Sequence, residues 1–267
     1  MSTHQPKRAI IHSTMRDAGF WEKVFTRLRS PLASVPECAH MASMSESLRH
    51  GYMAPSYRVI AENLVFAVQY TVHASVEGDI AEFGVQTGRT AAAITAAMKL
   101  VRASKNAHFF DSFEGLPEAT SKVDLENVHV KTGVWGKGAL KGITPDLLRR
   151  KCSRFIADES IKIYRGWFSS TLTQIPAGTT FCMLHVDCDL YSSTFEVLEF
   201  MVKTRSLSPG AIILFDDWQC NQASNEHGER KAWRDLCGLY DIEYSDLGAY
   251  GWAGQKFIVH RYSPKNR

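Results

Sequence analysis

Apolar residues follow two different spacings along the chain, and the change between them lies near residue 75. Residues 15–28 and 57–72 carry apolar side chains at the spacing of one helix face. Beyond them, short apolar runs alternate with helix-like segments, as in βαβ units whose helices cover both faces of a parallel sheet. We therefore predict an α/β fold, with an N-terminal helical extension over residues 1–75 and the main domain over residues 76–267. The extension is expected to serve as a lid or a partner interface.

The alternating part of the chain predicts the strands and helices of this sheet in order. Strands are expected at residues 79–84, 108–111, 161–165, 181–187 and 211–216. Helices are expected at residues 90–101, 145–155 and 194–204. An antiparallel pair of strands is expected to close the sheet edge at residues 242–244 and 255–260.

The predicted strands share a feature at their carboxyl ends, where the chain places acidic residues or glycine. In open α/β sheets, ligands bind in the crevice outside these ends, near the point where the strand order reverses. The sequence therefore directs several carboxylates toward one cleft. The residues at these strand ends are Glu82, Gly84, Asp111, Asp187, Asp216 and Asp217.

The turn at residues 82–88 has the features of a cofactor-binding turn between a strand and an Ala-rich helix. Gln86 stands where a dinucleotide site has its second early glycine, which favours a cofactor without pyrophosphate. Asp111 is expected to accept hydrogen bonds from ribose hydroxyls, or alternatively to cap the element that follows it. Trp167 and Phe168, after Gly166, offer an aromatic wall for an adenine ring, or alternatively belong to the core.

Paired acids follow two of the buried strands directly. Buried carboxylates are costly unless they are hydrogen-bonded, protonated or bound to a cation. Asp187, Asp216 and Asp217 offer hard oxygen ligands for Mg²⁺, Mn²⁺ or Ca²⁺; the alternative is that Asp216 and Asp217 are caps. A cation lowers the pKa of a coordinated hydroxyl, and Asp189 is the candidate general base that removes its proton.

Composition and charge exclude several other classes of protein. The net charge of +3 is too small, and Lys and Arg are too scattered, for a nucleic-acid-binding face. No apolar stretch is long enough for a signal peptide or a membrane span. The 6 cysteines form no CxxC pair, which fits free thiols in a reducing compartment. We therefore expect a cytoplasmic protein that binds a small molecule and does not bind nucleic acid or a membrane. We also expect it to form a homodimer.

These motifs together resemble the macrocin O-methyltransferases and their relatives, which methylate sugars in macrolide and aminocoumarin antibiotics. The resemblance runs from about Tyr57 to the C-terminus. Its most specific strings are DSFEGLP at residues 111–117 and DCDLYSST at residues 187–194. Shorter matches lie at residues 78–85, 166–168, 208–210 and 216–217.

The resemblance implies a Rossmann-like class I methyltransferase fold with a mostly parallel seven-stranded sheet, S-adenosylmethionine as cofactor and Mg²⁺ as cation. Carried over, it makes Asp187, Asp216 and Asp217 the metal ligands and Asp189 the base. It also implies a mobile lid, matched by residues 118–144, and a hydroxylated acceptor that is a sugar or another natural-product intermediate. Cofactor contacts are expected at Glu82, Gly84, Gly88, Thr90, Asp111, Ser112, Gly166, Trp167, Phe168 and Asp187.

The chain departs from the family pattern beside the expected metal site. Cys188 stands where the family usually has glycine, and His185 where it often has leucine. We expect His185 to be a core histidine bonded within the sheet and Cys188 to reshape the acceptor pocket. Residues 218–230 are also more polar than the family pattern. These departures affect which acceptor we expect more than they affect the expected methyl transfer.

Three other functions compete with this interpretation. A catechol-type or other diol O-methyltransferase typically has lysine three residues after the first metal aspartate, where this chain has Leu190. A nucleotide-dependent oxidoreductase needs a pyrophosphate-binding turn, which Gln86 disfavours. A non-catalytic cofactor-binding protein is disfavoured because every expected acid is present.

Overall fold

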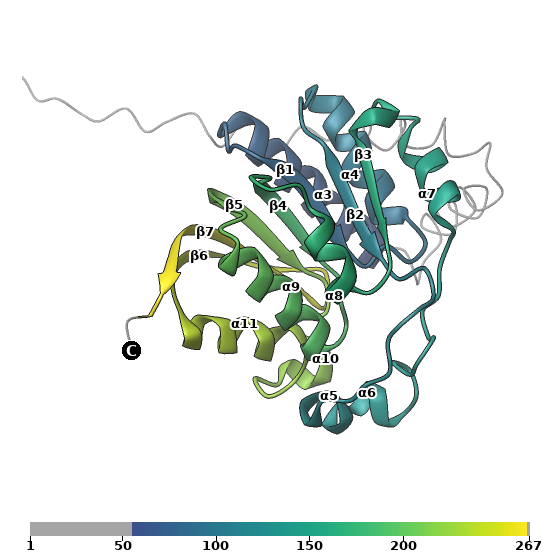
Figure 1. The fold of residues 1–267 in the computed structure, drawn as a ribbon, viewed down its shortest axis with the longest axis vertical. Coiled ribbons are helices and arrows are strands. Elements are labelled where there is room, and N and C mark those ends of the chain that lie inside the picture. Colours follow the sequence, from purple (N-terminus) through teal and green to yellow (C-terminus); the bar gives the residue numbers. More distant parts are fainter. Residues whose placement is uncertain (1–54, 266–267) are drawn as a thin grey trace, which may run out of the picture.

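The structure is a computed structural model that describes residues 55–265 (Figure 1). The helix predicted over residues 15–28 lies outside this range. A seven-stranded sheet forms the centre of the described chain, in the order β3-β2-β1-β4-β5-β7-β6. Its strands are β1 (Asp79–Phe83), β2 (Ala107–Asp111), β3 (Ile161–Arg165), β4 (Phe181–Val186), β5 (Leu207–Phe215), β6 (Tyr240–Tyr250) and β7 (Gly254–Pro264).

β1 to β5 run parallel to one another, and β7 runs in the opposite direction between β5 and β6. β1 pairs with β2 and β4, β2 with β3, and β4 with β5, all in parallel. β7 pairs antiparallel with β5 and with β6. The sheet therefore confirms the predicted mostly parallel α/β fold and its antiparallel closing pair. Because the strand order reverses between β1 and β4, the ligand crevice is expected outside their carboxyl ends.

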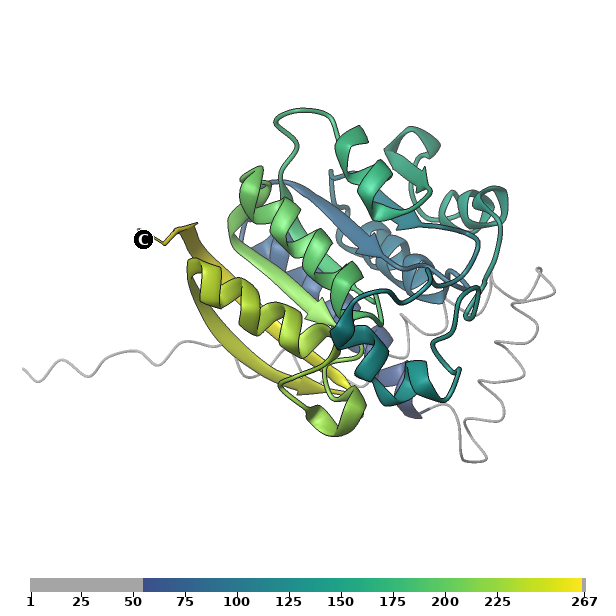
Figure 2. The ribbon, with the colours of Figure 1, turned by 60° about the horizontal axis from the view of Figure 1, so that its bottom comes forward.

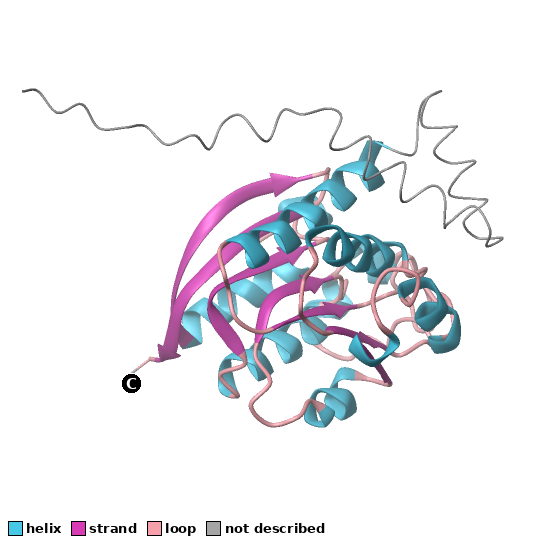
Figure 3. Cartoon of the chain, turned by 90° about the horizontal axis from the view of Figure 1, so that it is seen from above, coloured by secondary structure: helices cyan, strands magenta, loops and turns pink. Residues whose placement is uncertain are grey.

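Helices cover both faces of the sheet, as predicted (Figure 3). On one face lie α3 (Pro55–His73), α4 (Arg89–Val101) and α7 (Pro145–Cys152). On the other lie α8 (Phe168–Thr171), α9 (Tyr191–Lys203) and α11 (Gly228–Leu239), of which α9 and α11 run side by side in Figure 2. The shorter elements are α5 (Lys122–Glu126), α6 (Val128–Lys131), η2 (Asp158–Ser160), η3 (Leu172–Gln174) and α10 (Cys220–Ala223).

Two apolar clusters, one on each face, hold these layers together. In β4, Met183 packs into the cluster of α3 and α4, whereas Leu184 packs into that of α9 and α11. Ile212 and Ile213 of β5 divide in the same way. Successive side chains of a strand point to opposite faces, so a strand covered on both sides reads as a continuous apolar run. No helix of the described chain is long and apolar enough to cross a membrane.

α3 packs into the main core although it precedes residue 75. Leu64, Val65 and Val68 of α3 are buried in the same cluster as Ile94 of α4. The helix thus helps to cover the sheet that positions the site. The predicted division at residue 75 stays a prediction, because most of the first part lies outside the described residues.

Candidate active site

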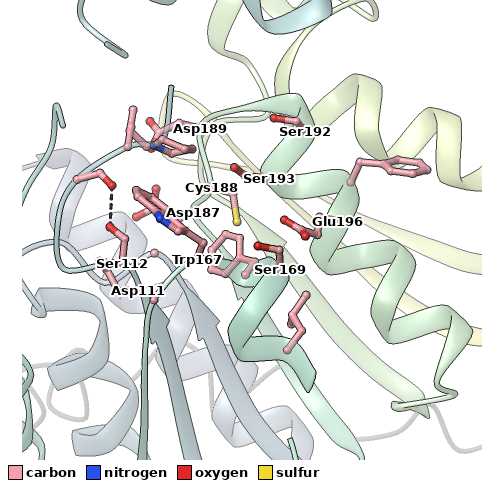
Figure 4. Close-up of a pocket in the computed structure, with 18 of the residues that line it drawn as sticks. Asp111, Ser112, Trp167, Ser169, Asp187, Cys188, Asp189, Ser192, Ser193 and Glu196 are labelled. Carbon is pink, nitrogen blue, oxygen red and sulfur yellow. Dashed lines mark hydrogen bonds between the residues drawn. The ribbon is translucent and has the colours of Figure 1, made fainter. Parts of the chain in front are cut away.

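A cavity of about 1220 Å³ opens at the carboxyl ends of the parallel strands (Figure 4). It brings together strand-end residues that are far apart in the sequence, as the acidic strand ends indicated. Of the predicted cofactor contacts, Glu82, Gly88 and Thr90 are not among the residues that line this cavity. Those that line it are Gly84, Asp111, Ser112, Gly166, Trp167, Phe168 and Asp187.

The turn after β1 lies directly against the end of β4. Gly84 has a φ of +89°, and a Cβ built on it would lie 1.9 Å from the carbonyl oxygen of Asp187. Only glycine fits such a position. The N–H of Asp187 also donates to the carbonyl of Phe83 at 2.9 Å. The predicted cofactor turn and the first predicted metal ligand are therefore in direct backbone contact.

Asp111 ends β2 and holds the same turn. One of its carboxylate oxygens accepts the N–H groups of Val85 (2.7 Å) and Gln86 (3.1 Å). The other accepts the N–H of Phe113 at 2.6 Å, which is the capping role raised as the alternative. Each carboxylate oxygen has two lone pairs, so Oδ2 is fully used by its two N–H partners and Oδ1 can accept one further hydrogen bond. Its contact with a ribose stays a prediction.

Trp167 and Phe168 follow β3 and are buried to different extents. Trp167 is 42% exposed and lines the cavity. Phe168 lines it too, but its ring packs edge-on against Phe83, with centroids 5.8 Å apart, at the border of the α9 cluster. The wall open to a ligand therefore comes mainly from Trp167, while Phe168 contributes to the core.

Three carboxylates come together at the ends of β4 and β5. Oxygen atoms of Asp187, Asp189 and Asp217 all lie within 4.8 Å of one another. Asp216 lines the same cavity, and its Oδ1 lies 3.9 Å from Nε2 of His185. The structure thus gathers three of the four predicted acids and places Asp216 beside them. Which of them are ligands and which is the base stays a prediction.

Asp189 is buried, Asp187 and Asp217 are half-buried, and the charges of this acid cluster repel one another. Burial, followed by the neighbouring carboxylates, raises the pKa of Asp187 and of Asp189 well above the usual range. Burial and then Asp216 raise the pKa of Asp217 to about 6. Like charges repel strongly where solvent screens them poorly. A cation among these oxygens would stabilise all of them in the carboxylate form.

His185 lies inside the sheet, next to Glu82. Both side chains are fully buried, and Nδ1 of His185 is 3.0 Å from Oε1 of Glu82. This confirms the prediction of a core histidine bonded within the sheet, and Glu82 itself does not line the cavity. Burial disfavours the imidazolium, but the carboxylates of Asp216 and Glu82 outweigh it and raise the pKa of His185 well above its usual value. Cys188, the other departure, is buried and lines the cavity.

Glu229, at the start of α11, supports the acid cluster and was missed by the sequence interpretation. It is fully buried, and it accepts backbone N–H groups from Cys188 and Asp217. The only sequence signal was the unexpected polarity of residues 218–230. A buried carboxylate that binds backbone amides leaves no spacing pattern, because its partners belong to other strand ends.

Asp124, in α5, is a second fully buried acid that the sequence interpretation missed. It accepts the N–H groups of Tyr191 and Ser192 at the start of α9. Its local signal is the spacing Ser121-x-x-Asp124, a capping-box pattern, and the hydroxyl of Ser121 does donate to it. Nothing in that pattern points to α9.

The segment at residues 118–144, matched to a lid by the resemblance, covers the end of the site that carries the acid cluster. Trp135 is buried and packs with Leu190, Cys220 and Ala253, two of which follow the acid-bearing strand ends. Lys137, Gly138 and other residues of the segment line the cavity. The position over the site agrees with a lid, and the mobility of the segment stays a prediction.

Sequence comparisons find relatives among the O-methyltransferases. The family model described as "Macrocin-O-methyltransferase (TylF)" matches residues 52–240. A demethyldecarbamoylnovobiocin O-methyltransferase of Streptomyces niveus is 27% identical over 179 residues, which are 62% of this chain and 64% of that protein. The chain therefore spans less than two thirds of the length of this relative.

Solved structures share the fold at low sequence identity. The O-methyltransferase NovP matches with a TM-score of 0.61 at 22% identity, over 75% of this chain and 79% of that one. CalS11, a calicheamicin methyltransferase, matches with a TM-score of 0.62 at 21% identity, over 97% and 98%. An apo structure of CalS11, described as a TDP-rhamnose 3'-O-methyltransferase, matches with a TM-score of 0.54 at 22% identity, over 95% and 99%. These likenesses confirm the class I methyltransferase fold.

The family match covers most of the chain and includes the turn after β1 and the acid cluster after β4 and β5. It confirms the resemblance. This chain belongs to the macrocin O-methyltransferase (TylF) family.

Proposed function

We propose that this chain transfers the methyl group of S-adenosylmethionine to a hydroxyl of a small-molecule acceptor, with a hard divalent cation such as Mg²⁺ at the acid cluster. The observation that carries the proposal is the contact of Gly84 with Asp187 at the edge of one cavity. It puts a turn suited to the methyl donor beside carboxylates suited to a cation. Methyl transfer depends above all on such proximity and alignment.

The donor side of the cavity fits a nucleoside-bearing cofactor. S-adenosylmethionine supplies an activated methyl group on a sulfonium. In the proposed complex, Asp111 accepts a hydrogen bond from a ribose hydroxyl, and Trp167 borders the adenine. Gly84 lets the backbone approach the cofactor without a side chain in the way.

The acceptor side fits a hard divalent cation. Oxygens of Asp187, Asp189 and Asp217 lie close together, and Oδ1 of Asp216 is buried without a hydrogen-bond partner among the described residues. Carboxylate oxygens are the ligands that Mg²⁺ and Mn²⁺ prefer. In the proposed enzyme, Asp187, Asp216 and Asp217 hold the ion. A cation at this position lowers the pKa of a hydroxyl that coordinates it.

Asp189 is proposed to accept the proton that the acceptor hydroxyl loses. Asp189 is only 7% exposed and lines the cavity two residues beyond Asp187. A positioned carboxylate of this kind acts as a general base when it lies within hydrogen-bond reach of the hydroxyl. The surrounding burial keeps bulk water from competing for the proton.

The acceptor is proposed to be a sugar hydroxyl or a hydroxyl of another natural-product intermediate. The names of the relatives support this class, since one is named for demethyldecarbamoylnovobiocin and CalS11 for TDP-rhamnose. The catechol-type alternative is less favoured, because the fully buried Leu190 occupies the position of its lysine. A homodimer is also part of the proposal, and light scattering tests it.

Calorimetric titration of S-adenosylhomocysteine, and then of Mg²⁺, into the purified protein tests the proposed function. We expect saturable binding of the cofactor product, a further response to Mg²⁺ that EDTA reverses, and no binding of NAD⁺. Methyl transfer that persists in EDTA would overturn the metal requirement. Binding of NAD⁺ in place of S-adenosylhomocysteine would overturn the cofactor.

A further inference from the structure

We propose that Glu229 and Asp124 are positioning residues that clamp the segment from Cys188 to Ser192 at both ends and thereby fix Asp189. This inference rests on the proposed function, in which Asp189 acts on the acceptor hydroxyl. Neither acid touches the acceptor in this role. Both act through backbone N–H groups of the clamped segment.

The segment needs support because Asp189 has an unfavourable backbone conformation. Its φ of +59° lies in the left-handed region, where the Cβ of an L-residue comes close to the following carbonyl oxygen. Such conformations persist at functional sites when the surrounding structure holds them. Cys188 and Asp189 line the cavity at the end of β4 (Figure 4), so a change in this backbone would move the proposed base.

Glu229 holds the first amide of the segment. Its Oε1 accepts the N–H of Cys188 at 3.2 Å, and its Oε2 accepts the N–H of Asp217 at 2.9 Å. Cys188 follows β4 and Asp217 follows β5, so one carboxylate joins the two strand ends that carry the acid cluster. Because Glu229 is fully buried, its removal would leave two backbone N–H groups without their hydrogen-bond partner.

Asp124 holds the other end of the segment. Its Oδ1 accepts the N–H of Tyr191 at 2.8 Å, and its Oδ2 accepts the N–H of Ser192 at 3.2 Å. These groups belong to the first turn of α9, which has no side-chain cap of its own. The first N–H groups of a helix need partners, and a negative charge is favoured there. Asp124, from α5, supplies both.

The clamp links the lid segment to the acid cluster. Asp124 lies within residues 118–144, and Trp135 of the same segment packs against Leu190 inside the clamped stretch. If this segment moves away, α9 loses the partner of two N–H groups and Leu190 loses its cover. The placement of Asp189 is therefore coupled to the position of the lid, and the base is fixed when the cavity is covered.

Backbone hydrogen exchange, resolved by residue with NMR on the full chain, tests this coupling. Glu229→Ala should speed exchange at the amides of Tyr191 and Ser192, which Glu229 does not touch. Asp124→Ala should speed exchange at the amide of Cys188, which Asp124 does not touch. Unchanged exchange at these remote amides in folded variants would overturn the clamp.

Mn²⁺ binding, followed by electron paramagnetic resonance with S-adenosylhomocysteine present, gives a second readout. Glu229→Ala should weaken Mn²⁺ binding by about tenfold or more, the usual effect of removing a partner that orients metal ligands. The affinity for S-adenosylhomocysteine should stay close to that of the wild type, because Asp111 and Gly84 are untouched. A merely structural defect would weaken both, and equal loss of the two affinities would count against the clamp.

Matched controls are the exposed acids Glu226, just before α11, and Glu126 in α5, whose substitution by alanine should leave exchange and binding as in the wild type. If Glu229→Ala does not fold, Glu229→Gln replaces it, because glutamine keeps the size of the side chain and one acceptor oxygen. Asp124→Ala then tests the other end of the clamped segment. A wild-type protein that binds neither S-adenosylhomocysteine nor Mn²⁺ would overturn the proposed function. The exchange experiment would still decide the clamp.

Discussion

Nδ1 of His185 lies 3.0 Å from Oε1 of Glu82, and neither side chain is exposed to solvent. The two residues are register partners on neighbouring strands β4 and β1. On its other side, the imidazole faces Asp216 at the end of β5. The histidine thus joins the strand of the cofactor turn to the strands of the acid cluster.

His185→Leu, which introduces an apolar side chain at this position, should destabilise the protein by about 3 kcal/mol or more. The reason is that Glu82 would then be a buried carboxylate without its partner. The double variant Glu82→Gln with His185→Leu should recover part of this loss. Urea unfolding of the wild type, both single variants and the double variant measures the coupling. A single variant as stable as the wild type would mean that the pair contributes nothing to stability.

Asn substitutions separate the roles of Asp216 and Asp189. Asp216→Asn should weaken Mn²⁺ binding by about tenfold or more, because it removes a charged ligand. Asp189→Asn should retain Mn²⁺ and S-adenosylhomocysteine binding but slow methyl transfer by about a hundredfold, as expected for loss of a general base. If Asp189→Asn weakens Mn²⁺ binding and Asp216→Asn does not, Asp189 is a metal ligand. Its closeness to Asp187 and Asp217 would then account for that role.

Asp111→Ala should weaken S-adenosylhomocysteine binding several-fold or more, with a lower Tm. It removes the proposed ribose acceptor and also the acceptor of the N–H groups that shape the turn after β1. Calorimetry and thermal unfolding on the same sample distinguish the two effects. A lower Tm with an unchanged dissociation constant would restrict Asp111 to its structural role.

Asp79 gives a stability contribution that depends on pH. Burial opposes its charge, but hydrogen bonds with His108 and Asn106 outweigh burial and lower the pKa of Asp79. Since an unfolded aspartate has a pKa of about 3.9, this contribution is present above that pH and is lost as the pH falls through the lower folded pKa. Asp79→Asn should therefore lower Tm by a few degrees at neutral pH and by less in acid. The exposed Asp158→Asn is the control, and an equal Tm difference at both pH values would contradict the prediction.

The parallel strands could be predicted because each is a short apolar run that ends in an acid or in glycine. Residues 161–165 form β3 with the predicted bounds. β5 begins at Leu207, earlier than the predicted start at residue 211. The prediction missed this start because Ser208, Pro209 and Gly210 interrupt the apolar run. α11 was not predicted, since its buried Ala232, Trp233 and Leu236 form a narrow stripe among charged residues.

Glu229 and Asp124, which support the site, could not be predicted from the sequence, for a different reason. Glu229 and Cys188 are 41 residues apart, and Asp124 and Tyr191 are 67 residues apart. Their hydrogen bonds end on backbone amides, which every residue except proline carries, so the partner leaves no mark in the sequence. The acids that face the cavity could be predicted because they lie at the ends of predicted strands. Glu229 and Asp124, which bind backbone N–H groups, could be recognised only from the folded structure.

The contact of Gly84 with the carbonyl of Asp187 leaves no room for a single added carbon. In the proposed enzyme, the path along which the methyl group travels is therefore set by two backbones rather than by adjustable side chains. Residues of α9 that line the cavity can then vary to admit differently shaped acceptors while the transfer distance stays constant.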